Sequence, residues 1–379
     1  MRYQTGSEFI ERSVFTWVST LVLSISIAAI PARMLGARVP DKTTSELQAV
    51  NTGPEAGETI PSFSLRDQNG NRQTFENLRG SKGLLLLVYR SADWCPWCKS
   101  QLVQLERKRK SFEQNSINVT ALSYDSVEVL KHFSKRRGIG FTLLSDPDSV
   151  LIRKLGILNR LTPRRHAFFG VPYPGQHLIS EKGVIKEKFF EQNYRDRFTT
   201  DLVMVRQLGS DLGARHTEIE MDHLKVSLWA SDEVLVGGNR ITLVLDINIK
   251  DGMHVYAPEV EGYIPIEWEL EKVAGVSNYT TIYPQPEMLY LPVIEEIVPA
   301  YQDSVRLLTD IKIGQKKQLE HLLNDMGELI VRGRLRYQAC DDKICYLPQE
   351  IPLKWIFTLD DLDHTRVPEN LRRERLSSQ

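Results

Sequence analysis

Two hydrophobic patterns divide this chain near residue 209. In the first part, apolar runs alternate with amphipathic stretches. Residues 83–90 are almost entirely apolar, which is typical of a buried strand, and residues 95–115 place Leu102 and Leu105 on one face of a helix. Strands that alternate with helices predict a largely parallel sheet that is covered on both faces.

The other elements of this first part continue the alternation. Further strands are predicted at residues 117–123, 141–145, 176–180 and 184–190. Further helices are predicted at residues 126–137, 146–155 and 194–208. Together these elements predict an α/β domain over residues 57–208.

The second part of the chain has a shorter period. From about residue 218, short segments alternate apolar and polar positions between Gly, Pro and Asn turns, which indicates an antiparallel β-sandwich. We place the sandwich at residues 220–359, between a linker at 209–219 and a polar tail at 360–379. Its predicted strands are residues 224–229, 240–249, 266–270, 305–313, 328–337 and 351–357, and residues 316–325 form its one predicted helix.

The N-terminus carries an uncharged apolar run. Residues 14–30 follow Arg2 and Arg12, a pattern that is typical of a secretory signal. Extended to Leu35, the same run is long enough to anchor the chain in a bilayer. We therefore predict a signal peptide or an N-terminal membrane anchor at residues 1–37, followed by a linker at 38–56. Either one predicts an extracytoplasmic location, periplasmic or in the cell envelope, where disulfide chemistry operates.

Length and charge limit the function classes. The chain has 379 residues and a net charge of -1, from 48 basic and 49 acidic residues. The chain is long enough for two or three domains. Its basic residues form no cluster along the sequence that would bind the phosphate backbone of a nucleic acid. Nucleic acid is therefore not an expected partner.

Four cysteines form two closely spaced pairs. Cys95 and Cys98 follow a buried strand directly and begin the next helix. Free amide groups and the helix dipole at a helix N-terminus lower the pKa of a thiol. Cys95 is therefore predicted to attack a disulfide, and Cys98 to resolve the mixed disulfide. A structural disulfide or part of a zinc site is the alternative, although zinc would need two more ligands.

The second pair, Cys340 and Cys345, lies between two predicted strands. Two cysteines on either side of a hairpin turn can approach within bonding distance. So short a loop restricts the unfolded chain little, which favours redox work over stabilisation. Short structural disulfides nevertheless occur in secreted domains, so the spacing leaves both roles open.

The motif W-C-P-W-C-K after a buried strand resembles the thioredoxin superfamily. Residues 57–198 are similar to its redoxin branch, the AhpC/TSA and TlpA/ResA-like proteins. The resemblance implies a thioredoxin-like fold, thiol-disulfide exchange and substrate contacts from Trp94, Pro96 and Trp97. It also implies that Pro174 is the cis proline beside the cysteine pair and receives the substrate chain.

Two departures from these families bear on the chemistry. Tyr89 stands where thioredoxins often bury an acidic residue that assists proton transfer. The peroxiredoxin motif P-x-x-x-T-x-x-C is incomplete, because Val88 and Ala92 stand at its Pro and Thr positions when Cys95 is the attacking residue. A thiol-dependent peroxidase, with Cys95 oxidised to a sulfenic acid, is therefore the alternative function.

The stretch YQACDDKICYLPQ, residues 337–349, resembles the cysteine hairpin in the N-terminal domain of DsbD, an immunoglobulin-like sandwich. This resemblance implies that Cys340 and Cys345 are a second redox pair, with His254 and Tyr256 nearby. Residues 284–292 are either a counterpart of the cap loop that shields the disulfide in that family or an ordinary loop bounded by Pro.

The sequence thus predicts a multidomain protein, in which an α/β thioredoxin-like fold is followed by an all-β immunoglobulin-like sandwich. Its predicted function is extracytoplasmic thiol-disulfide exchange through both cysteine pairs, without a cofactor or a metal. Expected partners are disulfide- or thiol-bearing proteins and a separate membrane electron donor. The non-enzymatic alternative is a sandwich that only binds a partner and carries a structural disulfide.

Overall fold

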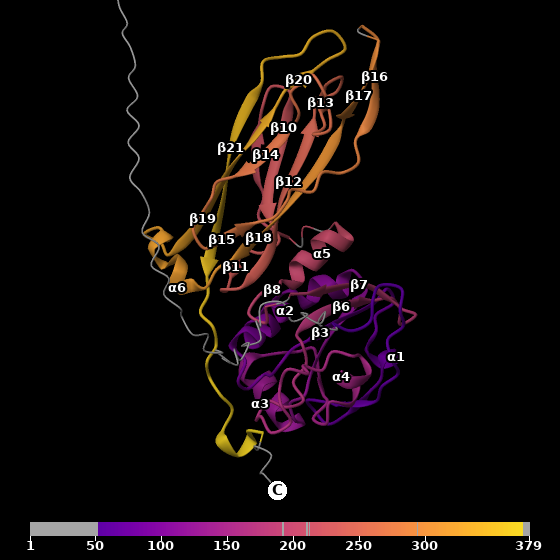
Figure 1. Cartoon of the computed structure of the whole chain (residues 1–379), viewed down its shortest axis with the longest axis vertical. Helices are drawn as coiled ribbons and strands as arrows, with labels where there is room; N and C mark the ends of the chain where they lie inside the picture. The colour runs from indigo at the N-terminus through magenta and orange to yellow at the C-terminus, as the bar shows by residue number, and fades with distance from the viewer. Residues whose placement is uncertain (1–51, 192, 210, 212, 294, 374–379) are drawn as a thin grey trace, which may run out of the picture. The chain divides into compact units, whose positions relative to one another are not determined.

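The computed structural model describes residues 52–373, apart from residues 192, 210, 212 and 294 (Figure 1). The predicted signal or anchor at residues 1–37 and most of the linker after it lie outside the described residues. Within the described ranges, no helix is both long enough and apolar enough to cross a membrane.

A seven-stranded sheet with the order β2-β1-β5-β4-β3-β6-β7 forms the centre of the α/β domain. The strands are β1 (Leu65–Asp67), β2 (Arg72–Gln73), β3 (Gly83–Val88), β4 (Ile117–Ser123), β5 (Thr142–Ser145), β6 (Gly175–Ile179) and β7 (Ile185–Phe190). The helices are α1 (Phe75–Leu78), α2 (Pro96–Gln114), α3 (Val127–Arg137), α4 (Val150–Lys154) and α5 (Thr200–Leu208). A central sheet that alternates with helices along the chain confirms the α/β fold predicted for this domain.

The sheet is mixed, so the expectation of a largely parallel sheet is wrong. Only the three central strands, β5, β4 and β3, run parallel to one another. β6 pairs antiparallel with both β3 and β7. β6 and β7 are joined by a tight turn at Gly183, and a turn this short can connect only antiparallel neighbours.

The apolar run of β3 is explained by burial on both faces. Alternate side chains of a strand point to opposite faces of its sheet. Leu85 and Leu87 belong to the buried cluster that includes Leu102 and Leu105 of α2, whereas Leu84 and Leu86 belong to a second cluster on the other face. Since both faces are covered, the sequence of β3 shows no alternation.

The sandwich consists of three sheets. One has the order β15-β18-β12-β10-β9, the second β11-β21-β19-β14 and the third β16-β17-β13-β20. The strands are β9 (Thr217–Glu220), β10 (Leu224–Ala230), β11 (Val234–Leu235), β12 (Asn239–Ile249), β13 (His254–Tyr256), β14 (Glu267–Leu270), β15 (Val276–Asn278), β16 (Glu287–Leu291), β17 (Glu296–Tyr301), β18 (Ser304–Ile313), β19 (Glu328–Tyr337), β20 (Ala339–Cys340) and β21 (Gln349–Leu359). Helix is limited to α6 (Lys316–Leu319) and a 3-10 turn at Glu320–Leu322. The predicted strand-rich sandwich is confirmed.

The segment before α5 differs from the predicted helix at residues 194–208. Arg197–Phe198 forms a short strand, β8, which pairs with the first two residues of β12. The Thr199 side chain then accepts a hydrogen bond from the Leu202 amide and caps α5. Because β8 pairs with β12 and Thr199 caps the helix, α5 begins at Thr200 and not at residue 194 as predicted.

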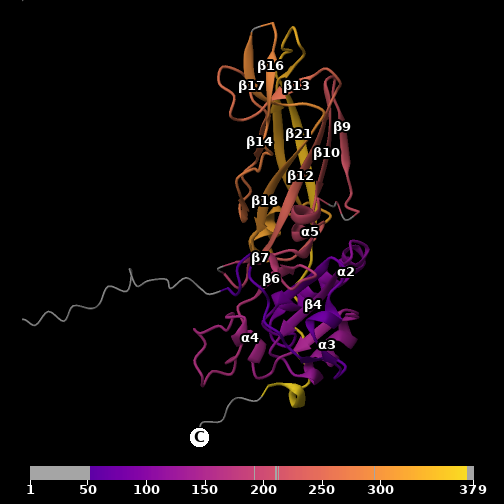
Figure 2. The ribbon, with the colours of Figure 1, turned by 90° about the vertical axis from the view of Figure 1, so that its right-hand side faces the viewer.

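The C-terminal segment, residues 360–373, continues beyond β21 (Figure 2). It contacts the α/β domain rather than the sandwich alone. Val367 is buried, and Arg373 donates hydrogen bonds to the carbonyls of Tyr124 and Pro147. The first fourteen residues of the predicted polar tail are therefore an ordered part of the structure.

Candidate functional site

Cys95 and Cys98 lie where β3 ends and α2 begins, and they form a disulfide. Cys95 is the N-cap of α2, and its sulfur accepts a hydrogen bond from the Cys98 amide at 3.3 Å. Pro96 occupies the first helical turn, where its missing N–H costs no hydrogen bond. The Arg90 amide points at the Cys98 sulfur, at 3.4 Å. Each sulfur therefore accepts a hydrogen bond from one backbone amide, which would stabilise a thiolate.

Both predicted tryptophans beside the pair are packed by aromatic and cationic side chains. Trp94 stacks on Phe168 at 4.1 Å, and its indole N–H donates to the Tyr124 hydroxyl at 2.9 Å. Trp97 meets the edge of Tyr194 at 6.1 Å. The Arg90 guanidinium lies 4.6 Å from the Trp94 ring. Only part of each tryptophan is exposed, so each can offer an apolar edge to another chain.

Pro174 is buried and immediately precedes β6. The first residue of β6, Gly175, pairs with Val88 at the end of β3. This register brings Pro174 to the same edge of the sheet as the loop that carries Cys95. The predicted substrate role of Pro174 remains a prediction.

A buried carboxylate that the sequence reasoning missed lies beneath the loop before Cys95. Asp125 accepts hydrogen bonds from the Ser91 hydroxyl at 2.8 Å, the Ala92 amide at 2.6 Å and the Ser123 hydroxyl at 3.1 Å. Burial raises the pKa of Asp125 to about 6, against the lowering effect of these hydrogen bonds. Tyr89, which replaces the expected acid, is fully buried. An ionisable carboxyl is thus present, just after β4, the strand that neighbours β3.

A sequence signal for Asp125 did exist. It lies two residues after the end of β4, and β4 pairs in parallel with β3. The carboxyl ends of neighbouring parallel strands meet at one edge of the sheet, so a polar residue there faces the loop after β3. The thioredoxin pattern places the acid at the position of Tyr89 instead, directly after β3 rather than after its neighbour.

Cys340 and Cys345 also form a disulfide, with Cα atoms 4.0 Å apart. The turn between them is held by Asp341, whose carboxylate accepts hydrogen bonds from the amides of Lys343 and Ile344. Its backbone amide donates to the Ile344 carbonyl at 3.0 Å. The second pair is thus built on a tight, internally bonded hairpin.

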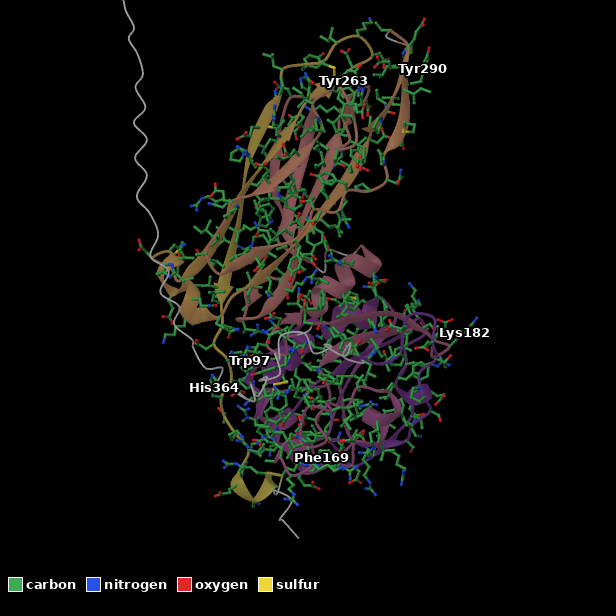
Figure 3. The ribbon with its side chains drawn as sticks, viewed as in Figure 1. Trp97, Phe169, Lys182, Tyr263, Tyr290 and His364 are labelled. Carbon is green, nitrogen blue, oxygen red and sulfur yellow. A yellow bond between two sulfur atoms is a disulfide. The ribbon has the colours of Figure 1, made fainter. Side chains whose placement is uncertain are left out.

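The residues predicted to lie near this pair are close to it. His254 of β13 is the register partner of Cys340. The Tyr256 hydroxyl lies 3.5 Å from the Cys345 sulfur, and its ring stacks on Tyr263 at 4.5 Å. Figure 3 shows Tyr263 at the end of the sandwich that carries β16 and β17. Burial lowers the pKa of His254, which favours its neutral form.

Residues 284–292 are neither an irregular loop nor a free flap. Most of them form β16, which pairs with β17 over five residues. Leu291 belongs to the buried cluster that contains Cys340 and Tyr256. This segment therefore packs against the side of the hairpin that carries Cys340.

The two sulfurs of the second pair differ in exposure. Cys340 is 1% exposed, whereas Cys345 is exposed, as are Ile344 and Leu347. Leu347 has 86% of its surface exposed. An incoming thiolate would therefore meet Cys345 first, on a surface with apolar side chains.

The two disulfides are connected to opposite ends of β12. Its first residues pair with β8, where the Phe198 carbonyl accepts a hydrogen bond from Gln101 of α2. Its last residue leads through a turn into β13, the partner of β20. Eleven extended residues span about 36 Å. Direct contact between the two pairs would therefore require a change in this arrangement.

Comparisons with known proteins match the two parts separately. The model of the AhpC/TSA family matches residues 56–188, and that of "Thiol:disulfide interchange protein DsbD, N-terminal" matches residues 225–353. The predicted resemblances to these two families are thereby confirmed.

Individual relatives match the α/β domain. Peroxiredoxin Bcp of Escherichia coli (strain K12) is 30% identical over 126 residues, which are 33% of this chain and 76% of that protein. Alkyl hydroperoxide reductase E of Mycobacterium bovis is 29% identical over 132 residues, 34% of this chain and 81% of that protein. The crystal structure of peroxidoxin BcpB from Mycobacterium tuberculosis matches with a TM-score of 0.34 and 20% identity, over 37% of this chain and 87% of that one.

Proposed function

This chain belongs to the AhpC/TSA family and carries a DsbD N-terminal domain, and from that premise we propose that it exchanges electrons between thiols and disulfides through both of its cysteine pairs. That it is a thiol oxidoreductase follows from the family. The finer proposal is that Cys95 attacks a disulfide and Cys98 resolves the mixed disulfide. Cys340 and Cys345 are then a second redox-active pair that exchanges electrons with the first.

One observation carries this proposal: each pair is a disulfide with a sulfur that is prepared for exchange. Cys95 caps a helix N-terminus, where a thiolate is stabilised. Cys345 lies on an exposed hairpin next to a buried partner sulfur. Both disulfides close short loops and therefore restrict the unfolded chain little. Stabilisation of the fold alone would thus be a weak reason for either disulfide.

Exchange between the two cysteine pairs would take two steps. The Cys95 thiolate attacks Cys345, a Cys95–Cys345 bond forms, and Cys340 leaves as a thiolate. Cys98 then attacks Cys95 and releases Cys345, so the first pair ends oxidised and the second pair reduced. The reverse sequence reduces the first pair, and the direction depends on the two reduction potentials.

We place this activity outside the cytoplasm, in the periplasm or cell envelope, because of the apolar N-terminal run. Partners would be proteins that bear thiols or disulfides. A separate membrane electron donor would supply the electrons. Fractionation of cells that express the full chain tests the location: recovery in the cytoplasmic fraction would refute it.

The direct test uses two double variants of the full chain. Cys98→Ser with Cys340→Ser leaves Cys95 and Cys345, and glutathione disulfide should drive them into a Cys95–Cys345 disulfide that peptide mass spectrometry detects. Cys98→Ser with Cys345→Ser leaves the buried Cys340 and should form its cross-link much more slowly. If neither variant cross-links although glutathione modifies Cys95, the first pair works without the second.

Peroxide reduction is a second candidate, since the matched relatives include a peroxiredoxin and an alkyl hydroperoxide reductase. In that reaction the Cys95 thiolate would attack one peroxide oxygen and become a sulfenic acid, while the other oxygen leaves as an alcohol or as water. Cys98 would then attack the sulfenic acid, form the Cys95–Cys98 disulfide and release water. The Thr expected beside the nucleophile is Ala92 in this chain, which argues against it. Rapid peroxide consumption that is lost in Cys95→Ser would favour this candidate over exchange.

A further inference from the structure

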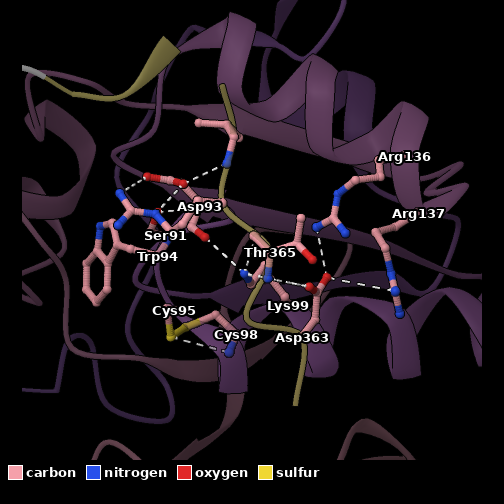
Figure 4. A network of polar contacts seen from close by, with 12 residues as sticks. Ser91, Asp93, Trp94, Cys95, Cys98, Lys99, Arg136, Arg137, Asp363 and Thr365 are labelled. Atoms are coloured by element: carbon pink, nitrogen blue, oxygen red, sulfur yellow. Dashed lines mark hydrogen bonds and ion pairs between the residues drawn. A yellow bond between two sulfur atoms is a disulfide. The ribbon is translucent and has the colours of Figure 1, made fainter. Parts of the chain in front are cut away.

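The C-terminal segment reaches the first cysteine pair from a distant part of the sequence. Figure 4 shows residues 363–367 crossing beside the start of α2, with polar contacts to the residues on either side of the disulfide. These contacts involve Asp93, two residues before Cys95, and Lys99, one residue after Cys98. Both are charged side chains that are almost completely buried.

Arg366 neutralises Asp93. Asp93 is 4% exposed, and its side chain accepts two hydrogen bonds from the Arg366 guanidinium, at 2.7 and 2.5 Å. The Val367 amide donates a third, at 3.0 Å. A bidentate guanidinium is the strongest partner that a carboxylate finds in proteins. Without it, the carboxylate would be a buried charge with no cation bonded to it in the described structure.

The same segment holds Lys99. Lys99 is 1% exposed, and its ammonium donates hydrogen bonds to the carbonyls of Thr365 at 2.7 Å and Asp93 at 3.0 Å. Asp363 lies 3.9 Å from it and is also paired with Arg136 of α3 at 2.8 Å. Burial lowers the pKa of Lys99 to about 8, an effect that Asp363 opposes.

From these contacts we propose that residues 363–367 are a positioning element of the thiol site, in which Arg366 controls the reactivity of Cys95 by neutralising Asp93. The inference rests on the proposed role of Cys95 as the attacking residue. Arg366 touches neither sulfur, and it would act only through the charge of Asp93.

Loss of Arg366 is expected to disfavour the Cys95 thiolate for an electrostatic reason. An uncompensated carboxylate near a thiol disfavours the thiolate, whereas a paired carboxylate is nearly neutral at a distance. Other charged groups around the two held residues are Asp125 beneath the loop, Arg136 and Arg137 of α3, and Asp363 itself. The Lys99 ammonium is a further cation near Asp93, but it bonds to the main-chain carbonyl and not to the carboxylate. The loss of Arg366 would therefore leave the Asp93 carboxylate without a bonded cation in the described structure.

The test measures alkylation of reduced Cys95 by iodoacetamide in the full chain, as a function of pH. Arg366→Gln keeps hydrogen-bonding atoms but removes the charge, and it should slow alkylation at pH 7 by about three- to tenfold and move the pH profile upward. Arg366→Lys should recover most of the rate. Adding Asp93→Asn to Arg366→Gln should restore the rate to within about twofold of the original, because the unpaired charge is then gone.

The control is Arg107→Ala, which breaks an exposed ion pair to Asp360 in the same segment and should leave the profile unchanged. An unchanged profile in Arg366→Gln would overturn the proposal. So would a double variant that stays as slow as Arg366→Gln, since the effect would then come from detachment of the segment. Iodoacetamide needs no protein partner, so this result is independent of whether the two pairs exchange.

Discussion

The two disulfides of this protein differ in how far their sulfur atoms are exposed to solvent. The first is formed by two buried cysteines at the start of a helix, and it depends on neighbouring residues to receive a partner. The second joins a buried Cys340 to an exposed Cys345 on a hairpin. The first site therefore resembles a prepared nucleophile, and the second an accessible target.

This difference shows how the same bond can be prepared for opposite roles. At the first site, the helix N-terminus and the backbone donors favour a thiolate. At the second site, one sulfur is packed in a cluster with Tyr256 and Leu291, while the other faces solvent. An incoming thiolate would attack the exposed sulfur, Cys345, and this selection does not require a shifted pKa of either thiol.

The largest expected effect tests whether the first site is the nucleophile. Cys95→Ser should reduce the rate of insulin disulfide reduction by on the order of 1,000-fold, because it removes the sulfur that is proposed to attack the substrate disulfide. Cys345→Ser should retain the rate to within a few-fold. The rate is followed by turbidity with dithiothreitol as reductant. A slow Cys345→Ser variant together with an active Cys95→Ser variant would reverse the assigned roles.

A smaller effect tests the asymmetry of the second site. The Cys345 thiol in Cys340→Ser should be alkylated about tenfold or more faster than the Cys340 thiol in Cys345→Ser, because only Cys345 is exposed. Mass spectrometry of the two alkylated peptides measures both rates. Equal rates would mean that the hairpin opens readily and that burial does not select the sulfur.

Asp125 makes the stability of the first site depend on pH in the weakly acidic range. Its folded pKa of about 6 lies above the ordinary 3.8, so the folded protein holds this proton more tightly than the unfolded chain. The stabilisation is complete below about pH 4 and is lost as the pH rises through 6. Thermal melting should therefore show the wild type losing stability relative to Asp125→Asn across this window.

The control for that experiment is Asp148→Asn, which changes an exposed carboxylate in the same domain. Its melting curve should follow the wild type at every pH. If Asp125→Asn also follows the wild type between pH 4 and 7, the carboxyl under the loop is not the group that titrates.

The smallest effect concerns the hydroxyl beside Cys345. Tyr256→Phe removes the 3.5 Å contact to the sulfur but keeps the ring that stacks on Tyr263. It should slow alkylation of reduced Cys345 by about two- to fivefold, the size expected for one lost hydrogen bond. Tyr263→Phe loses only a hydrogen bond to Glu296 and serves as the matched control. Equal rates in both variants would leave Tyr256 a packing residue.

Much of the fold could be predicted because its determinants are local. Burial on both faces makes β3 an unbroken apolar run, and one-sided burial makes the sandwich strands alternate. The limits of α2 and β4 were predicted to within one residue. Strand direction was not, since the antiparallel pairing of β6 depends on which neighbour it joins rather than on its own composition.

The sequence by itself determined the two cysteine pairs, because partners three and five positions apart need only a helix turn or a hairpin to meet. Tertiary structure alone decided their surroundings. Arg366 meets Asp93 across 273 positions, and Asp125 supports a loop 33 positions away. A single polar contact between distant segments leaves no periodic pattern in the sequence, and its free energy depends on burial that only the folded chain creates.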